Sequence, residues 1–139
     1  MAIDFSSITL EFVDISTNAT PDIYINQNSI AFSKRVLEEL NYPQNVQFGV
    51  DAAQHIFAIK PCKSNESRAT PFSKPKAEQT SVLSMSNKNL FEIVTKLIPD
   101  YQSGSGIRYK VTGVFDMENK VMYYDMTTAE ATEYRAPKN

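Results

Sequence analysis

The chain holds one histidine and one cysteine, the two residue types whose site chemistry is easiest to recognise. His55 and Cys62 stand seven positions apart, at the two ends of a stretch that we expect to be one strand. Because side chains alternate along a strand, this odd separation places them on opposite faces and argues against a Cys–His nucleophile pair. A structural zinc site needs about four ligands at spacings such as C-x-x-C, which the sequence lacks. The pair therefore predicts neither catalysis nor a metal.

Two letter patterns known from enzymes occur in unsuitable surroundings. Ser73 and Lys76 fit S-x-x-K, but Pro75 lies between them in a polar stretch, where the required helix is not expected. Gly104 and Gly106 lead from an expected helix into an expected strand, the reverse of a phosphate-binding loop. No two carboxylates have sequence support as a general acid and base. We therefore expect no enzymatic activity, cofactor or metal; a site assembled from distant residues is the remaining enzymatic alternative.

Length and composition predict one ordinary globular domain spanning residues 1–139. A single cysteine allows no intrachain disulfide and favours a reducing compartment. The N-terminus carries Asp4 where a signal peptide would carry a basic residue, and no apolar run approaches the roughly 20 residues of a membrane span. We therefore expect a cytoplasmic protein without membrane contact, either a monomer or a homodimer.

Charge is unevenly distributed along the chain. Residues 1–59 carry seven acidic and two basic side chains, whereas residues 60–76 carry five basic side chains against Glu66 alone. The polar, proline-containing stretch 60–79 is therefore expected to be a basic connector between two structured halves. Such bases could neutralise phosphates, although linkers are commonly charged without any such role. The candidate nucleic-acid contacts are Lys34, Arg35, Lys60, Lys63, Arg68, Lys74 and Lys76.

Apolar spacing predicts seven strands and two short helices. The first helix begins after Ser33 and ends near Asn41, with Phe32, Val36, Leu37 and Leu40 on one face. The second is capped by Asn87 or Asn89 and has Leu90, Ile93, Val94 and Leu97 on its inner face. A polar tail follows residue 125 and is expected to be frayed. The expected strands cover residues 8–15, 22–26, 46–50, 55–60, 81–85, 107–115 and 120–126.

The order of elements occurs twice. Residues 22–62 and 80–128 each predict a strand, a helix and a hairpin, and Val36, Leu37 and Leu40 correspond in spacing to Ile93, Val94 and Leu97. We expect an internal repeat with pseudo-two-fold packing. The expected fold is α+β, with a small β-barrel or sheet core built from the two strand-helix-hairpin units.

Aromatic residues in the expected strands allow two interpretations. Tyr109, Phe115, Tyr123 and Tyr124 could form a platform on which nucleobases stack. Ordinary sheet packing is the alternative, and strand propensity alone favours it because aromatic residues are common in strands.

The segment SKRVLEELNYPQNVQFGVDAAQHIFAIKP resembles the AbrB/SpoVT group of DNA-binding domains. The resemblance consists of a short helix ending in a leucine, a V-x-F-x-V-D strand, a turn and an I-x-I-K-P strand. It implies an interlocked β-barrel made of two units, which MraZ-like tandem relatives carry in one chain. It also implies DNA binding, although the N-terminal half is acidic here where that family carries arginines. The residues that carry the resemblance are Ser33, Leu37, Leu40, Val46, Phe48, Val50, Asp51, Ile59, Lys60 and Pro61.

These features predict a non-enzymatic binding protein, with DNA-binding transcriptional regulation as the leading hypothesis. The alternative is a protein-interaction or inhibitor module of a phage or other mobile element. Small size, mild acidity and the lack of recognisable site chemistry suit that class as well.

Overall fold

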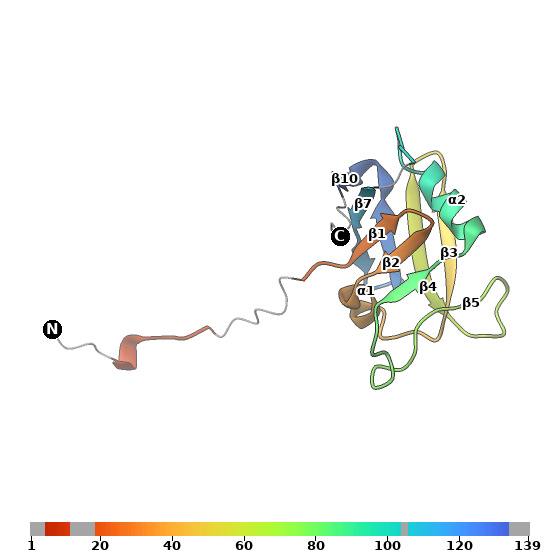
Figure 1. Ribbon diagram of the computed structural model, residues 1–139. Coiled ribbons are helices and arrows are strands. Elements are labelled where there is room, and N and C mark those ends of the chain that lie inside the picture. Colours follow the sequence, from red (N-terminus) through yellow and green to blue (C-terminus); the bar gives the residue numbers. More distant parts are fainter. Residues whose placement is uncertain (1–4, 12–18, 104–105, 134–139) are drawn as a thin grey trace, which may run out of the picture.

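The computed structural model describes residues 5–11, 19–103 and 106–133, and it shows two antiparallel five-stranded sheets with two short helices (Figure 1). Sheet I has the strand order β10-β7-β1-β2-β6, and sheet II has the order β5-β3-β4-β9-β8. The α+β class is therefore confirmed, whereas no closed barrel is present in the described part of the chain. The bounds are β1 Asp22–Asn26, β2 Ser29–Phe32, α1 Lys34–Glu39, β3 Asn45–Asp51, β4 Ile56–Cys62, β5 Thr70–Pro71, β6 Leu83–Met85, α2 Lys88–Lys96, β7 Ile107–Thr112, β8 Val114–Asp116, β9 Val121–Asp125 and β10 Glu130–Glu133.

The inner faces of the two sheets share one apolar core. Ile23 and Ile25 of β1 are buried together with Phe57 and Ile59 of β4, and in each strand the residue between them is more exposed. This period-two alternation is what a strand with one buried face requires. Burying a side chain of this size contributes about 1.5–3 kcal/mol, so the core supplies much of the driving force for folding.

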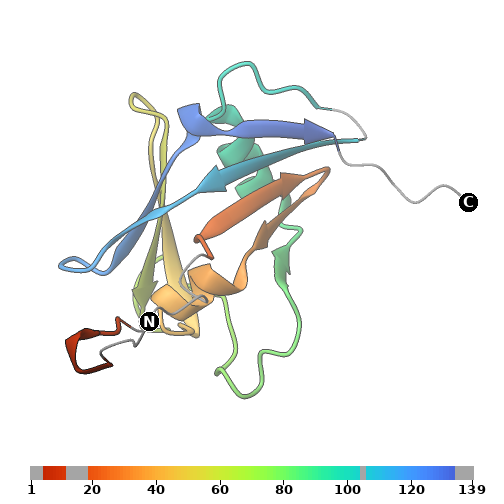
Figure 2. The same ribbon diagram turned by 90° about the vertical axis from the view of Figure 1, so that its left-hand side faces the viewer.

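One continuous stretch of chain connects the sheets, because β7 belongs to sheet I and β8 to sheet II (Figure 2). Gly113 stands between the two strands, and its amide donates a hydrogen bond to the carbonyl of Pro21 at 3.0 Å. A Cβ at Gly113 would lie 2.7 Å from the ring of Tyr124 and 2.9 Å from the sulfur of Met122. Glycine is therefore required here by close packing at the crossing.

Both helices begin as expected, but they are capped differently. Asn87 Oδ1 accepts a hydrogen bond from the amide of Leu90 at 3.0 Å, which satisfies one of the free amides of the first turn of α2. Ser33 precedes α1 without a side-chain cap. That helix ends at Leu40, and the following Asn41 and Tyr42 have left-handed backbone φ values of 61° and 49°. The left-handed residues Asn41 and Tyr42 therefore end the helix, and Pro43 follows after it has ended.

The stretch 60–79 is more structured than a connector. It contains β5, which pairs with β3, and it buries Phe72 and Ser73. The Phe72 ring centroid lies 5.0 Å from that of Phe32, and the Ser73 hydroxyl donates to the carbonyl of Pro43 at 2.6 Å. The stretch expected to be a basic connector is thus anchored in the core near its centre by an aromatic side chain.

Four further expectations need correction. Ile93 lies on the exposed side of α2, with Thr95 buried in its place, so the spacing match with Val36 does not extend to burial. Residues 130–133 pair with β7 as β10, so the tail continues the sheet before residue 134. Residues 29–32 form β2, a strand that sequence patterning missed. The expected strand 8–15 lies partly outside the described residues, and its described part, 8–11, is not in a strand.

The pairing registers bear on the expected repeat. In sheet I, Ala31 of β2 faces Ser84 of β6, and in sheet II, Ala58 of β4 faces Tyr123 of β9. Elements β1-β2-α1-β3-β4 are followed by β5-β6-α2, the β7–β8 strand and β9. The first strand of each series pairs with the hairpin of the other, β1 with β7 and β5 with β3. Both halves of the chain thus contribute strands to both sheets, and the internal repeat remains a prediction.

Candidate functional site

The two predicted bases on α1 are engaged by acidic residues of the same helix. Arg35 Nη1 lies 3.6 Å from Glu38, and Arg35 Nε lies 3.4 Å from Glu39. Lys34 Nζ lies 3.9 Å from Glu38, and the lysine side chain is 78% exposed. Exposed pairs of this kind contribute little to stability, but the two contacts reduce the positive field that Arg35 can offer a partner.

Lys60 and Arg68 are brought together at the outer face of sheet II. They line one hollow of about 340 Å³ with Gln47 and Tyr123, although the sequence separates them by a loop. The side-chain amide of Gln47 donates to the carbonyl of Ser67 at 2.8 Å, which holds the loop over the sheet. Neither base makes an ion pair within the described residues. Both cationic heads are therefore available to a partner.

The remaining predicted bases do not join this hollow. Lys63 and Lys74 are exposed, and Lys76 lines a separate hollow of about 650 Å³ beside Glu38 of α1. Lys34 lines a third hollow, on sheet I, with Tyr24 and Arg108. The structure thus divides the seven predicted contacts among different surfaces.

A row of small and apolar residues crosses the outer face of sheet II. The pairing registers align Gly49, Ala58, Tyr123 and Val114, one from each of four adjacent strands. Val114 is 72% exposed and Tyr123 is 40% exposed. Val114 also lies on β8, an edge strand of sheet II. This face therefore joins exposed apolar side chains to an open strand edge.

Acidic residues of the same sheet are satisfied within their own turns. The Asp116 carboxylate accepts hydrogen bonds from the side chain of Asn119 at 2.8 Å and from the Glu118 amide at 3.1 Å. The first of these bonds is the largest of several that lower the pKa of Asp116. Asp125 accepts from the amide and the hydroxyl of Thr127. These carboxylates do not neutralise Lys60 or Arg68 through direct contacts.

The aromatic platform considered from the sequence is reduced to one ring. Tyr109 and Tyr124 are buried and Phe115 is half-buried, so Tyr123 alone among the four exposes a large part of its side chain. Val114 and Gln47 were missed as site residues, and Tyr123 was considered only as part of a stacking platform. The alternation of Val114 with the half-buried Phe115 was the available signal, because it places Val114 on the outer face.

His55 and Cys62 are separated by the full length of β4. His55 precedes the strand with a left-handed φ of 58°, and its Nδ1 lies 2.9 Å from the carbonyl of Leu97. Desolvation and the nearby Glu66 raise the pKa of the Cys62 thiol, which disfavours the reactive thiolate. His55 therefore lies in the turn, not in the strand as expected, and the two residues form no dyad.

The described residues contain no group of three or more histidine, cysteine, aspartate or glutamate side chains arranged to hold a metal. Among the same residues, no helix combines the length and apolarity needed to cross a membrane. No family model, curated protein or solved structure matches the chain. The outer faces of the two sheets are therefore the candidate functional surfaces.

Proposed function

We propose that this is a non-enzymatic binding protein whose partner is another protein, docking on the outer face of sheet II. The observation that carries the proposal is the apolar row ending at Tyr123 and Val114, flanked by the unpaired Lys60 and Arg68. Exposed apolar side chains that gather on one surface commonly mark interaction sites. Tyrosine and arginine are enriched in such interfaces.

The partner is expected to bring apolar side chains and a carboxylate. Gly49 and Ala58 have little or no side chain, so a partner can approach the strands closely in the middle of the row. Lys60 and Arg68 would then meet the carboxylate at one side. The free edge of β8 offers backbone groups to an added strand, which is a common mode of peptide recognition.

A matched pair of substitutions tests the proposal. Val114 and Val82 are both 72% exposed, but Val114 lies on sheet II and Val82 lies beside β6 of sheet I. Affinity-tagged wild type, Val114→Glu and Val82→Glu would be purified from the native host. We expect a stoichiometric protein with wild type and Val82→Glu, reduced at least tenfold with Val114→Glu. Recovery of nucleic acid alone, or equal recovery with both variants, would contradict it.

Regulatory DNA binding is the second candidate, favoured by one specific observation. Lys60 and Arg68 line a common hollow and make no ion pair with any described residue, so both could contact phosphates. A gel shift at low salt with mixed duplexes should then show binding that is weakened by Lys60→Glu with Arg68→Glu. Absence of a shift at micromolar protein would exclude this function. The phage or mobile-element origin stays a prediction.

A further inference from the structure

The outer face of sheet I carries a trough that the sequence did not predict. Three adjoining hollows, of about 350, 400 and 220 Å³, follow one another across this face. The first and second share Asn26 and Arg108, and the second and third share Phe32, Lys34 and Val82. The trough therefore runs from the β7 side, over β1 and β2, to the beginning of α1.

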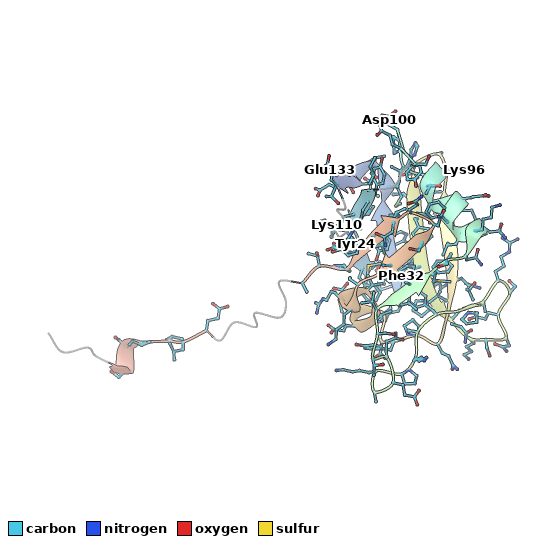
Figure 3. All side chains as sticks on the ribbon, in the orientation of Figure 1. Tyr24, Phe32, Lys96, Asp100, Lys110 and Glu133 are labelled. Carbon is cyan, nitrogen blue, oxygen red and sulfur yellow. The ribbon has the colours of Figure 1, made fainter. Side chains whose placement is uncertain are left out.

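A planar pair of side chains lies in the middle of the trough. The guanidinium carbon of Arg108 is 3.9 Å from the centroid of the Tyr24 ring, a cation–π contact between neighbouring strands. Lys110 faces Tyr24 in the register of β1 and β7, and Figure 3 shows Tyr24 and Lys110 close together. Arginine planes and aromatic rings are the surfaces on which proteins stack unpaired nucleobases.

Positive charge is available beside this pair. Lys34 lines the trough toward α1 and is held only by its long, exposed contact with Glu38. Lys110 faces Tyr24 from β7 and lies 4.0 Å from Glu130, a side chain that is 72% exposed. Asp22, the nearest acidic residue of β1, is buried and accepts hydrogen bonds from Thr20 and Thr112. Its carboxylate is therefore occupied within the fold.

We propose that this trough binds nucleotide units of a single-stranded nucleic acid, with a base on the Arg108–Tyr24 pair and phosphates near Lys34 and Lys110. A duplex keeps its bases stacked inside, so it cannot use the planar pair in this way. A single strand offers both a free base face and adjacent phosphates, and the length of the trough suits more than one nucleotide. The proposal is independent of the protein-binding face, which belongs to the other sheet.

Fluorescence anisotropy with labelled 12-nucleotide single strands of DNA and RNA at low salt tests it. We expect Arg108→Ala to weaken binding about tenfold or more, and Arg108→Lys to restore only part of it because lysine lacks the stacking plane. Lys34→Ala should reduce the slope of log affinity against log salt concentration by about the amount expected for one phosphate contact. Lys96→Ala, which removes an exposed base from α2, is the matched control and should bind as wild type.

Competition with unlabelled ligands distinguishes a free nucleotide from a single strand as the occupant of the trough. A mononucleotide that displaces the labelled strand at equal nucleotide concentration would support the site, with a free nucleotide as its occupant; weaker competition would support a strand. A blunt duplex or poly-glutamate that competes as well as the unlabelled strand would overturn the proposal. So would full affinity in both Arg108→Ala and Lys34→Ala, provided that circular dichroism shows both variants folded.

Discussion

The β3–β4 and β8–β9 hairpins of sheet II fill the space beside their first strands differently. In the β3–β4 hairpin, Phe48 faces Ile59, and the Phe48 ring stacks 5.6 Å from Phe57 and 6.4 Å from Phe32. In the second hairpin, Gly113 precedes the Val114–Tyr123 pair and packs against the ring of Tyr124. Beside β3 the space is filled by the Phe48 ring of that strand, whereas beside Gly113 it is filled by the Tyr124 ring of the returning strand. Gly113 is therefore in close contact with the core, although it carries no side chain of its own.

The comparison predicts the largest effect at Gly113. Gly113→Ala should destabilise the fold by about 3 kcal/mol, because the new Cβ would lie 2.7 Å from the fully buried Tyr124 ring and would force it to shift within the core. Gly49→Ala is the matched control: its nearest neighbour is Ala58 Cβ at 4.0 Å, and the change should stay within about 0.5 kcal/mol. Urea unfolding measures both. Equal midpoints for the two variants would break the comparison.

The next effect tests the bulky member of the first hairpin. Phe48→Ala should cost about 2 kcal/mol, because a half-buried ring that contacts three others is removed. Tyr123→Ala removes an aromatic residue from the outer face and should cost less than about 0.5 kcal/mol. Thermal unfolding of the two variants compares them. A larger loss in Tyr123→Ala would show that the outer face contributes to the core after all.

A smaller difference is expected between the two helix starts. Asn87→Ala should cost about 1 kcal/mol, since the hydrogen bond to the Leu90 amide is lost. Ser33→Ala should cost less than about half of that, because Ser33 makes no cap and its hydroxyl is 3.4 Å from the Thr20 carbonyl. Denaturant midpoints at constant slope measure both. Equal losses would contradict the difference in capping.

The smallest effect at neutral pH concerns the ring that packs on Gly113. The Tyr124 hydroxyl is buried without a hydrogen-bond partner among the described residues, so Tyr124→Phe should change stability by less than about 1 kcal/mol. Burial, followed by the carboxylates of Asp22 and Glu39, raises the pKa of Tyr124 well above its ordinary value of 10.0.

That shift gives the same variant a pH dependence. A raised pKa in the folded state means that wild type keeps its full stability below the unfolded pKa of about 10 and loses it as pH rises beyond that. Tyr124→Phe has no phenol to ionise at this position, so it should not lose stability in this way at high pH. Unfolding measured from pH 8 to 11 should therefore show the variant gaining on wild type at the alkaline end; parallel curves would count against the burial of an un-ionised phenol.

Local pattern was sufficient for much of the fold. The alternation in residues 22–26 and 46–50 predicted β1 and β3, and the residues before α1 and α2 predicted both helix starts. These features depend on residues only a few positions apart, so they can be predicted from the local sequence. Patterning failed at Ile93, whose helical spacing suits burial but whose position on α2 faces outward. Only the packing of α2 on the sheets decides which of two adjacent apolar residues is covered.

The candidate site was less accessible to sequence reasoning. The density of basic residues in the stretch 60–76 predicted Lys60 and Arg68 as contacts. Their common hollow depends on the loop that Gln47 holds over sheet II, which the sequence does not show. Arg108 was not predicted, because a single arginine in a strand carries no sequence signal. Its role depends on Tyr24, which comes from another strand and lies beneath the guanidinium group. The density of charge can be read along the sequence. Which charged side chains converge on one surface depends on how the strands pair in the folded sheet.

By itself the sequence determined the α+β fold class and the absence of a familiar signature at His55 and Cys62. It could do so because residue type and spacing along one strand are local quantities. The tertiary structure alone decided that β7 and β8 belong to different sheets, that Phe72 anchors the basic stretch 60–79 in the core, and that two outer faces differ in chemistry. Those outcomes depend on contacts between residues far apart in the chain, where packing and not local propensity sets the free energy.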